Sequence, residues 1–166
     1  MNKVMKALAI AALLVTVAGA CAVLYGVNMM TPQAQQVLVS ATPASQAQEV
    51  FDNVQSDLEN GTFTGRVYGA TDNLRAEDCT FLTYTVRLAN RGFFPAEWIE
   101  MTVIPSEGGG DVLQLPEDGG RVLAAGGVGD LSATLLTRAD AQDERRTLEV
   151  SCYVFGKKSV FRVEAN

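Results

Sequence analysis

The sequence predicts a mainly β protein, an antiparallel sandwich preceded by one transmembrane helix and one amphipathic helix. Three observations indicate this class. Residues 7–27 form an uncharged apolar run, and residues 45–60 repeat apolar side chains at helical spacing. From about residue 62 the apolar period changes to two, and turns rich in Gly and Asp separate the alternating segments.

The apolar run from Ala7 to Val27 is long enough to cross a bilayer. About 21 residues at ~1.5 Å each span the ~30 Å hydrocarbon core. Lys3 and Lys6 precede the run and favour a cytoplasmic tail over residues 1–6. We therefore expect a single-pass protein of the cell membrane, held by this helix, with its C-terminal domain outside the cytoplasm.

Three processing outcomes are open for this segment. Ala18–Ala20 fits the small-residue cleavage site of a signal peptide. Cys21 could carry a lipid, although Ala18 stands where a lipobox usually has leucine. An uncleaved anchor is favoured, because the apolar run continues past Cys21 to Val27 and Tyr25 suits the membrane interface.

Residues 28–60 are expected to form a stalk and then an amphipathic helix. The stretch 28–44 is uncharged and rich in Gln, Thr, Ala and Pro, which is typical of a stalk. Ser45 and Gln48 form a capping-box pattern, and Gly61 provides a stop. The apolar stripe of this helix consists of Ala47, Val50, Phe51, Val54 and Leu58. We expect the stripe to pack on the same domain, with a partner protein as the alternative.

Residues 61–166 are predicted to form the β-sandwich domain. In the strand 79–90 the even-numbered residues Leu82, Tyr84, Val86 and Leu88 are expected to face inward. In the strand 97–104 the inward residues are Ile99, Met101 and Val103. The other predicted strands cover residues 62–68, 111–115, 121–124, 130–137 and 147–155, and a last strand around Phe161 and Val163. Seven or eight short strands without intervening helices are typical of an immunoglobulin- or fibronectin III-like sandwich, and one open sheet backed by the helix is the alternative.

Composition argues against an enzyme and against nucleic-acid binding. The chain has no histidine, which removes Ser-His-Asp and Cys-His catalysis and every zinc site that needs histidine. All 19 acidic residues and all but two of the 13 basic residues follow the apolar run, so the domain lacks a phosphate-binding basic patch. We predict no catalytic residue, metal ion or cofactor, and no nucleic-acid partner.

Cys79 and Cys152 lie on the second and the penultimate predicted strands and invite a disulfide. Strand parity argues against the bridge, because Cys152 shares the inward register while Cys79 shares the outward register of Thr83. A bulge near Thr80 would reset that register. Two buried free thiols are the alternative.

An aromatic turn is the candidate binding surface. Phe93, Phe94 and Trp98 surround Pro95, and Trp98 has the opposite parity to the inward residues of its strand. An outward Trp beside two Phe residues is suited to contact a partner protein or the lipid headgroups. The alternative is that the turn folds over one end of the sandwich, or that Trp98 packs under the amphipathic helix.

The phrases YTVRLANRGFFPAEWIEMTVIP, GDVLQLP and GDLSATLLT resemble small, uncharacterised membrane-anchored proteins of Gram-positive bacteria. The outer part of those proteins resembles an immunoglobulin-like sandwich, and the likeness runs from Thr83 to the C-terminus. The segment Asn90-Arg91-Gly92 is also similar to a turn of bacterial adhesion and accessory sandwich domains, although turn geometry alone favours such residues. The resemblance implies no functional residue.

Two functions follow from these observations. The first is a non-catalytic, membrane-tethered binding or assembly module that docks an envelope or transporter protein. The alternative is an accessory or sensor domain that binds a ligand or carbohydrate through Phe93, Phe94 and Trp98. An exposed aromatic platform beside a groove would favour ligand binding, whereas buried aromatics beside a flat sheet edge would favour protein docking.

Overall fold

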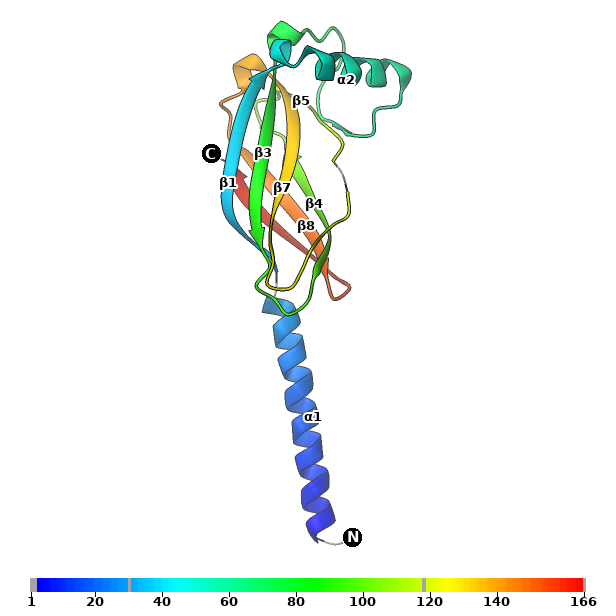
Figure 1. The fold of residues 1–166 in the computed structure, drawn as a ribbon, viewed down its shortest axis with the longest axis vertical. Helices are drawn as coiled ribbons and strands as arrows, with labels where there is room; N and C mark the ends of the chain where they lie inside the picture. Colours follow the sequence, from blue (N-terminus) through cyan, green and yellow to red (C-terminus); the bar gives the residue numbers. More distant parts are fainter. Residues whose placement is uncertain (1–2, 30, 118, 166) are drawn as a thin grey trace.

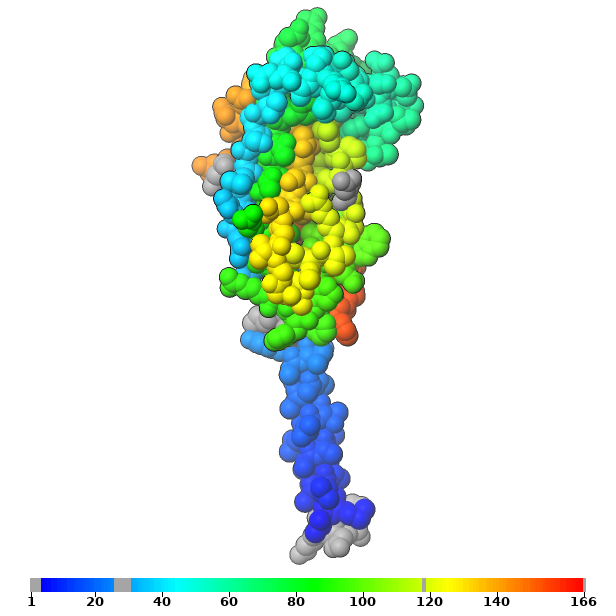
Figure 2. Space-filling view, viewed as in Figure 1, coloured from blue at the N-terminus to red at the C-terminus, as the bar shows by residue number. Residues whose placement is uncertain are grey.

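The computed structural model describes residues 3–29, 31–117 and 119–165. Helix α1 (Lys3–Met29) extends away from one end of a β-sandwich without packing on it (Figures 1 and 2). Its segment Val4–Tyr25 is long and apolar enough to cross a membrane, and none of that segment is buried. The Thr16 hydroxyl donates to the Ala12 carbonyl oxygen over 2.9 Å, so this polar group is satisfied within the helix.

Two antiparallel sheets form the sandwich, which confirms the mainly β class. The first sheet contains, in spatial order, β1 (Gln33–Pro43), β3 (Cys79–Ala89), β7 (Val128–Arg138), β5 (Asp111–Gln114) and β2 (Arg66–Val67). The second contains β6 (Arg121–Leu123), β4 (Ala96–Ile104), β8 (Arg146–Val154) and β9 (Lys157–Ala165). The strand predicted over 62–68 is reduced to the two residues of β2.

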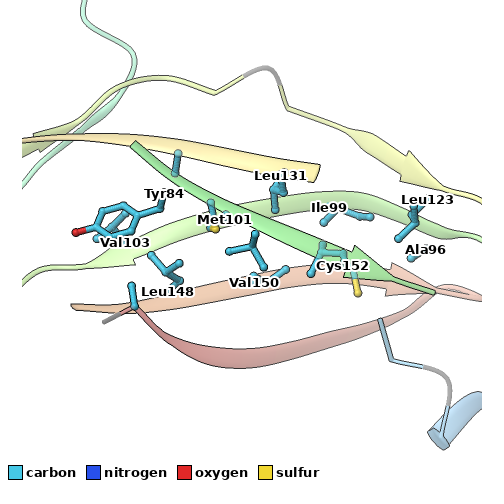
Figure 3. Packing of buried hydrophobic residues seen from close by; sticks show 14 of the residues in the cluster. Tyr84, Ala96, Ile99, Met101, Val103, Leu123, Leu131, Leu148, Val150 and Cys152 are labelled. Carbon is cyan, nitrogen blue, oxygen red and sulfur yellow. The ribbon is translucent and has the colours of Figure 1, made fainter. Parts of the chain in front are cut away.

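The main core lies between the two sheets (Figure 3). Alternation places the even-numbered apolar residues of β3 and the odd-numbered ones of β4 in this core, as predicted. The neighbouring strands β7 and β8 contribute Leu131, Ala133, Leu135, Leu148, Val150 and Cys152 to the same core. Each fully buried Leu or Val in such a core contributes about 1.5–3 kcal/mol relative to an exposed side chain.

A second apolar cluster lies on the outer face of the first sheet, under helix α2 (Gln48–Asn60). Phe51 and Val54 are buried there against Phe81 and Leu136, which confirms that the helix packs on its own domain. Val50 is 43% exposed and does not belong to the buried stripe, because the helix turns the Phe51 side toward the sheet.

The ends of α2 show one correct and one incorrect prediction. Gly61 ends the helix in the left-handed conformation, with φ of +68°, as predicted. The capping box is wrong: residues Ala44–Gln46 form a short 3-10 turn, and Ala47 precedes the helix without a side-chain cap. Since Ser45 lies inside that turn, its hydroxyl is not placed to cap the helix.

The predicted stalk over residues 28–44 is wrong for most of its length. Residues 33–43 form the edge strand β1, which pairs with β3 from Gln33 opposite Ala89 to Pro43 opposite Thr80. The strand is uncharged and mixes Gln, Ser and Thr with Val, Leu and Ala, and it forms because β3 offers it a free edge of backbone donors and acceptors. Ala34 and Val37 of this strand also pack against the main core.

A buried ion pair ties the two sheets together near α2. Arg146 and Asp111 lie 2.8 Å apart and both side chains are wholly inaccessible to solvent. Burial alone would raise the pKa of the Asp111 carboxyl, but hydrogen bonds from Arg146 and Ser106 outweigh it and hold the pKa below its usual range. Arg146 also donates to the carbonyl oxygens of Ala141 and Glu144, so it fixes the loop between β7 and β8.

The possible disulfide does not form, and both cysteines are free and buried. Cys79 belongs to the cluster under α2, whereas Cys152 belongs to the core between the sheets. The two thiols therefore lie on opposite faces of the first sheet, as the parity of their strands predicted.

Candidate functional site

A β-bulge in β4 shapes the outer face of the second sheet. Glu97 pairs with Tyr153 and Glu100 with Ser151, so three steps along β4 match two steps along β8. The same extra residue appears against β6, where the pairing moves from Ala96 to Ile99. The bulge allows Ala96 and Ile99 both to face the core, and it turns two consecutive residues, Glu97 and Trp98, outward.

Trp98 occupies the bulge in an unfavourable backbone conformation. Its φ is +51°, a region that bulky L-residues rarely adopt and that costs about 1–3 kcal/mol. The side chain is 63% exposed, as its parity predicted. The backbone of Gly120 lies against the indole ring: a Cβ placed there would be 3.5 Å from Cε3 and Cζ3. The protein therefore holds a large aromatic ring at its surface at a conformational cost.

An open depression of about 530 Å³ lies beside Trp98, over β4, β8 and the start of β9. Tyr153 provides a second aromatic side chain, partly exposed and paired in register with Lys158. The remaining residues of the lining are Glu97, Glu100, Ser151, Lys158 and Gly156. We call this surface the Trp98 platform. It combines two aromatic rings with two carboxylates, the hydroxyl groups of Ser151 and Tyr153, and one ammonium group.

Glu100 also borders a second depression, of about 360 Å³, that contains Glu117. There the side chain of Gln114 makes hydrogen bonds to the backbone of β4. It accepts from the Val103 N–H over 2.8 Å and donates to the Met101 carbonyl oxygen over 2.9 Å. Gln114 also donates to Glu117 over 2.7 Å. Burial raises the pKa of Glu117 to about 7, although hydrogen bonds from Met101 and Gln114 lower it. A group that titrates near neutral pH therefore lies next to the Trp98 platform.

The two predicted phenylalanines lie at the end of the sandwich, in the loop between β3 and β4. Asn90 is buried and fixes this loop, since its Nδ2 donates to the Phe94 carbonyl oxygen over 2.8 Å and its Oδ1 accepts from the Gly92 N–H over 3.0 Å. The Phe94 ring packs on the core and lies 4.8 Å from the Phe155 ring. Phe93, by contrast, is 82% exposed.

The structure thus separates the predicted aromatic patch into two places. Trp98 lies on the face of the second sheet, whereas Phe93 and Phe94 lie at its end. Sequence reasoning missed Tyr153 and Lys158 as neighbours of Trp98, because only the pairing register between β4, β8 and β9 brings them together. The sequence did contain one indication: Tyr153 lies between the inward residues Cys152 and Val154, so its side chain is expected to point outward.

Among residues 3–29, 31–117 and 119–165, no three His, Cys, Asp or Glu side chains are grouped so that they could hold a metal ion. Cys21, the candidate for lipidation, is exposed on α1. The thiols of Cys79 and Cys152 have raised pKa values because both are buried, so neither is an activated nucleophile.

No protein-family model and no curated protein sequence matches this chain. Among solved structures, it is similar to a protein from Archaeoglobus fulgidus with 12% identity and a TM-score of 0.36, over 80% of this chain and 94% of that chain. It is also similar to the cupredoxin domain of amoB from Nitrosocaldus yellowstonii with 15% identity and a TM-score of 0.34, over 81% of this chain and 86% of that chain. Because similarity at this level carries no argument about function, the Trp98 platform is interpreted from its own residues.

Proposed function

We propose that the chain is a non-catalytic binding module, tethered to the cell membrane by an uncleaved α1, whose Trp98 platform binds a carbohydrate outside the cytoplasm. The observation that carries the proposal is the exposed indole of Trp98, held in a bulge at φ of +51° above an open depression. Strained residues persist where the surrounding structure enforces them and are concentrated at functional sites.

The chemistry of the lining suits a sugar. Aromatic faces such as those of Trp98 and Tyr153 pack on the apolar C–H face of a pyranose ring, and they are enriched at recognition sites. The carboxylates of Glu97 and Glu100 accept hydrogen bonds from hydroxyl groups, and Ser151 can donate or accept. An open depression accommodates an internal segment of an oligosaccharide as well as its end.

The membrane tether is supported by the N-terminal segment. Val4–Tyr25 is long and apolar enough to span a bilayer, and the apolar run has no break at Cys21. Lys3 and Lys6 favour a cytoplasmic N-terminus, which would place the sandwich outside.

The order of strands supports an immunoglobulin-like assignment within the β-sandwich class. β1-β3-β7-β5 matches the A-B-E-D order of an immunoglobulin constant domain, and β4-β8-β9 matches its C-F-G sheet. This is consistent with the resemblance to small membrane-anchored proteins of Gram-positive bacteria. One departure matters for function: the Trp of strand C is buried in antibody domains, whereas Trp98 on β4 lies in the bulge and points outward.

Trp98 is the only tryptophan of the chain, so its fluorescence tests the proposal directly. The full chain in lipid nanodiscs is titrated with N-acetylchitotriose, cellotriose and maltotriose. We expect a saturable change in Trp98 emission with at least one of them, because a sugar stacked on the ring replaces water there. Choline chloride serves as the probe for a cationic ligand, which the two carboxylates could also attract.

Tyr153→Ala provides the decisive variant, because it removes half of the platform and keeps the reporter. We expect its affinity for the sugar to fall about tenfold, the equivalent of 1.4 kcal/mol. Val67→Ala is the matched control, since Val67 is an exposed apolar residue on the other sheet. The proposal is wrong if no sugar changes the emission, or if Tyr153→Ala binds as tightly as the control.

Docking of an envelope or transporter protein is a second candidate, favoured by the edge strand β1. This strand is uncharged throughout, pairs with β3 on one side and carries the exposed side chains Leu38 and Val39. An uncharged edge of this length is suited to the addition of a strand from another protein. Photocrosslinking from Leu38 in cells, with Val67 as control position, tests it, and the absence of a protein adduct specific to Leu38 would exclude it.

A further inference from the structure

The end of the sandwich nearest α1 carries exposed aromatic and basic side chains. Only residues 30–32 separate α1 from β1, and β1 begins opposite Ala89, the last residue of β3. The loop 90–95 that follows β3 therefore lies beside the end of α1 (Figure 1). The β8–β9 turn lies at the same end, because the Phe94 and Phe155 rings are in contact.

Phe155 is an unusual residue for its position. It and Gly156 form the two-residue turn of the β8–β9 hairpin, with φ of +51° and +74°. Turns of this geometry favour Asn, Asp or Gly, and a phenylalanine there strains the backbone. The side chain is nevertheless 66% exposed. Its contact with the Phe94 ring covers only part of the side chain, so an aromatic face remains exposed at this tip.

Basic residues accompany both exposed phenylalanines. Arg91 and Phe93 share the loop 90–95, and Lys157 follows the turn that carries Phe155. The two basic residues stand out because the sequence after the apolar run has an excess of acidic residues. Aromatic rings together with Lys and Arg are the combination found at the membrane interface, where basic side chains lie near lipid phosphates.

The short connection between α1 and β1 limits how far these side chains can lie from the lipid headgroups. Tyr25 ends the segment that can span the membrane, and Met29 is about 6 Å further along a helix that rises 1.5 Å per residue. Gln33 lies no more than about 14 Å beyond Met29, the reach of four extended residues. Each headgroup layer is about 5–7 Å thick. Figure 1 shows the loop 90–95 level with the C-terminal end of α1, about 6 Å beyond Tyr25, which is within the thickness of the headgroup layer.

We propose that this end of the sandwich docks on the lipid bilayer itself, with Phe93 and Phe155 at the level of the headgroups and Arg91 and Lys157 beside the phosphates. The inference rests on one part of the proposed function, the retention of α1, and is independent of carbohydrate binding. Docking orients the strands along the membrane normal, so that the Trp98 platform opens sideways above the surface.

Fluorescence quenching by spin-labelled lipids tests the docking. The full chain carries Trp98→Phe, so that a newly introduced tryptophan is the sole reporter, and it is reconstituted in phosphatidylcholine vesicles with and without phosphatidylglycerol. Phe155→Trp and Phe93→Trp are compared with Val50→Trp, an exposed position on α2 at the far end of the sandwich. Lipids labelled at acyl carbon 5 report shallow contact and those labelled at carbon 12 report deep contact.

We expect carbon-5 lipids to reduce the emission of both end reporters about twofold, and carbon-12 lipids to reduce it less, because the rings lie at the interface. Val50→Trp should stay unquenched. Arg91→Gln together with Lys157→Gln should weaken quenching in the vesicles with phosphatidylglycerol. If the mass of the protein shows an intact α1 and the end reporters remain as bright as Val50→Trp, docking is overturned while the proposed function stands. Loss of α1 would overturn the tether and the docking together.

Discussion

The buried pair Arg146–Asp111 and the exposed pair Arg87–Asp130 allow a matched test of what an ion pair contributes to this fold. Each pair has one Arg–Asp contact of 2.8 Å. The first is wholly inaccessible to solvent, whereas about half of each side chain in the second is exposed. Arg146→Met and Arg87→Met remove the same guanidinium from the two environments.

Arg146→Met leaves the Asp111 carboxylate buried with the Ser106 N–H as a remaining partner. Leaving one member of a buried pair uncompensated costs about 3–5 kcal/mol. For a sandwich of roughly 135 residues, that loss lowers the Tm by about 10–18 °C. Arg87→Met should change the Tm little, because water and salt already screen the exposed pair.

The assay is thermal loss of the β-sheet circular dichroism signal, measured on the full chain in detergent. Asp111→Asn combined with Arg146→Met should recover part of the loss, since the double variant buries no unpaired charge. The single variant should also gain stability as pH falls, because protonation neutralises the isolated carboxyl of Asp111. Equal Tm values for Arg146→Met and Arg87→Met would refute the reasoning.

Three further predictions concern other elements of the fold. The pKa of Glu117 is about 7 in the folded protein against 4.5 ordinarily, so the folded state binds the extra proton and stability falls as pH rises from about 4.5 to 7. After allowance for solvent screening the loss of stability is about 1–2 kcal/mol. The difference in Tm between the wild type and Glu117→Gln should therefore grow from pH 4.5 to 7, and a constant difference would contradict this prediction. Phe51→Ala should lower the free energy of unfolding by about 3–5 kcal/mol, seen as a lower Tm, whereas Val50→Ala on the exposed side of α2 should lower it far less. Equal losses of stability would show that α2 does not depend on its buried face. Trp98→Gly should be more stable than Trp98→Ala by up to about 1 kcal/mol in chemical denaturation, because glycine accepts φ of +51° without strain, and the reverse order would argue against a strained bulge.

The sequence predicted those parts of the fold whose pattern is local. Ile99, Met101 and Val103 alternate within one strand, and the helix spacing of Phe51 and Val54 identifies a face, so both could be predicted. The edge strand β1 could not, because its stability comes from pairing with β3, far away in the sequence. Its uncharged composition, rich in Gln, Thr, Ala and Pro, led to the prediction of a stalk.

The candidate site was predictable to the same extent. The outward direction of Trp98 follows from the parity of its own strand, but its neighbours Tyr153 and Lys158 come from other strands. Their arrival beside Trp98 depends on the pairing register and on one extra residue in β4, and neither leaves a mark in the local alternation. The turn at Phe155 could not be predicted for a different reason: such turns are normally identified by Asn, Asp or Gly at the first position, and this turn has a phenylalanine there.

The way in which α1 joins β1 also determines how the domain responds to mechanical load. A pull transmitted through α1 enters the sandwich at Gln33 and runs along β1 toward Pro43. The hydrogen bonds between β1 and β3 are perpendicular to that direction, so the whole ladder from Gln33–Ala89 to Pro43–Thr80 is loaded in shear and must yield together. The same ladder pulled from the Pro43 end, across the strands, would open one bond at a time. If α1 is retained as proposed, this shear geometry opposes the peeling of β1 from the sandwich under load.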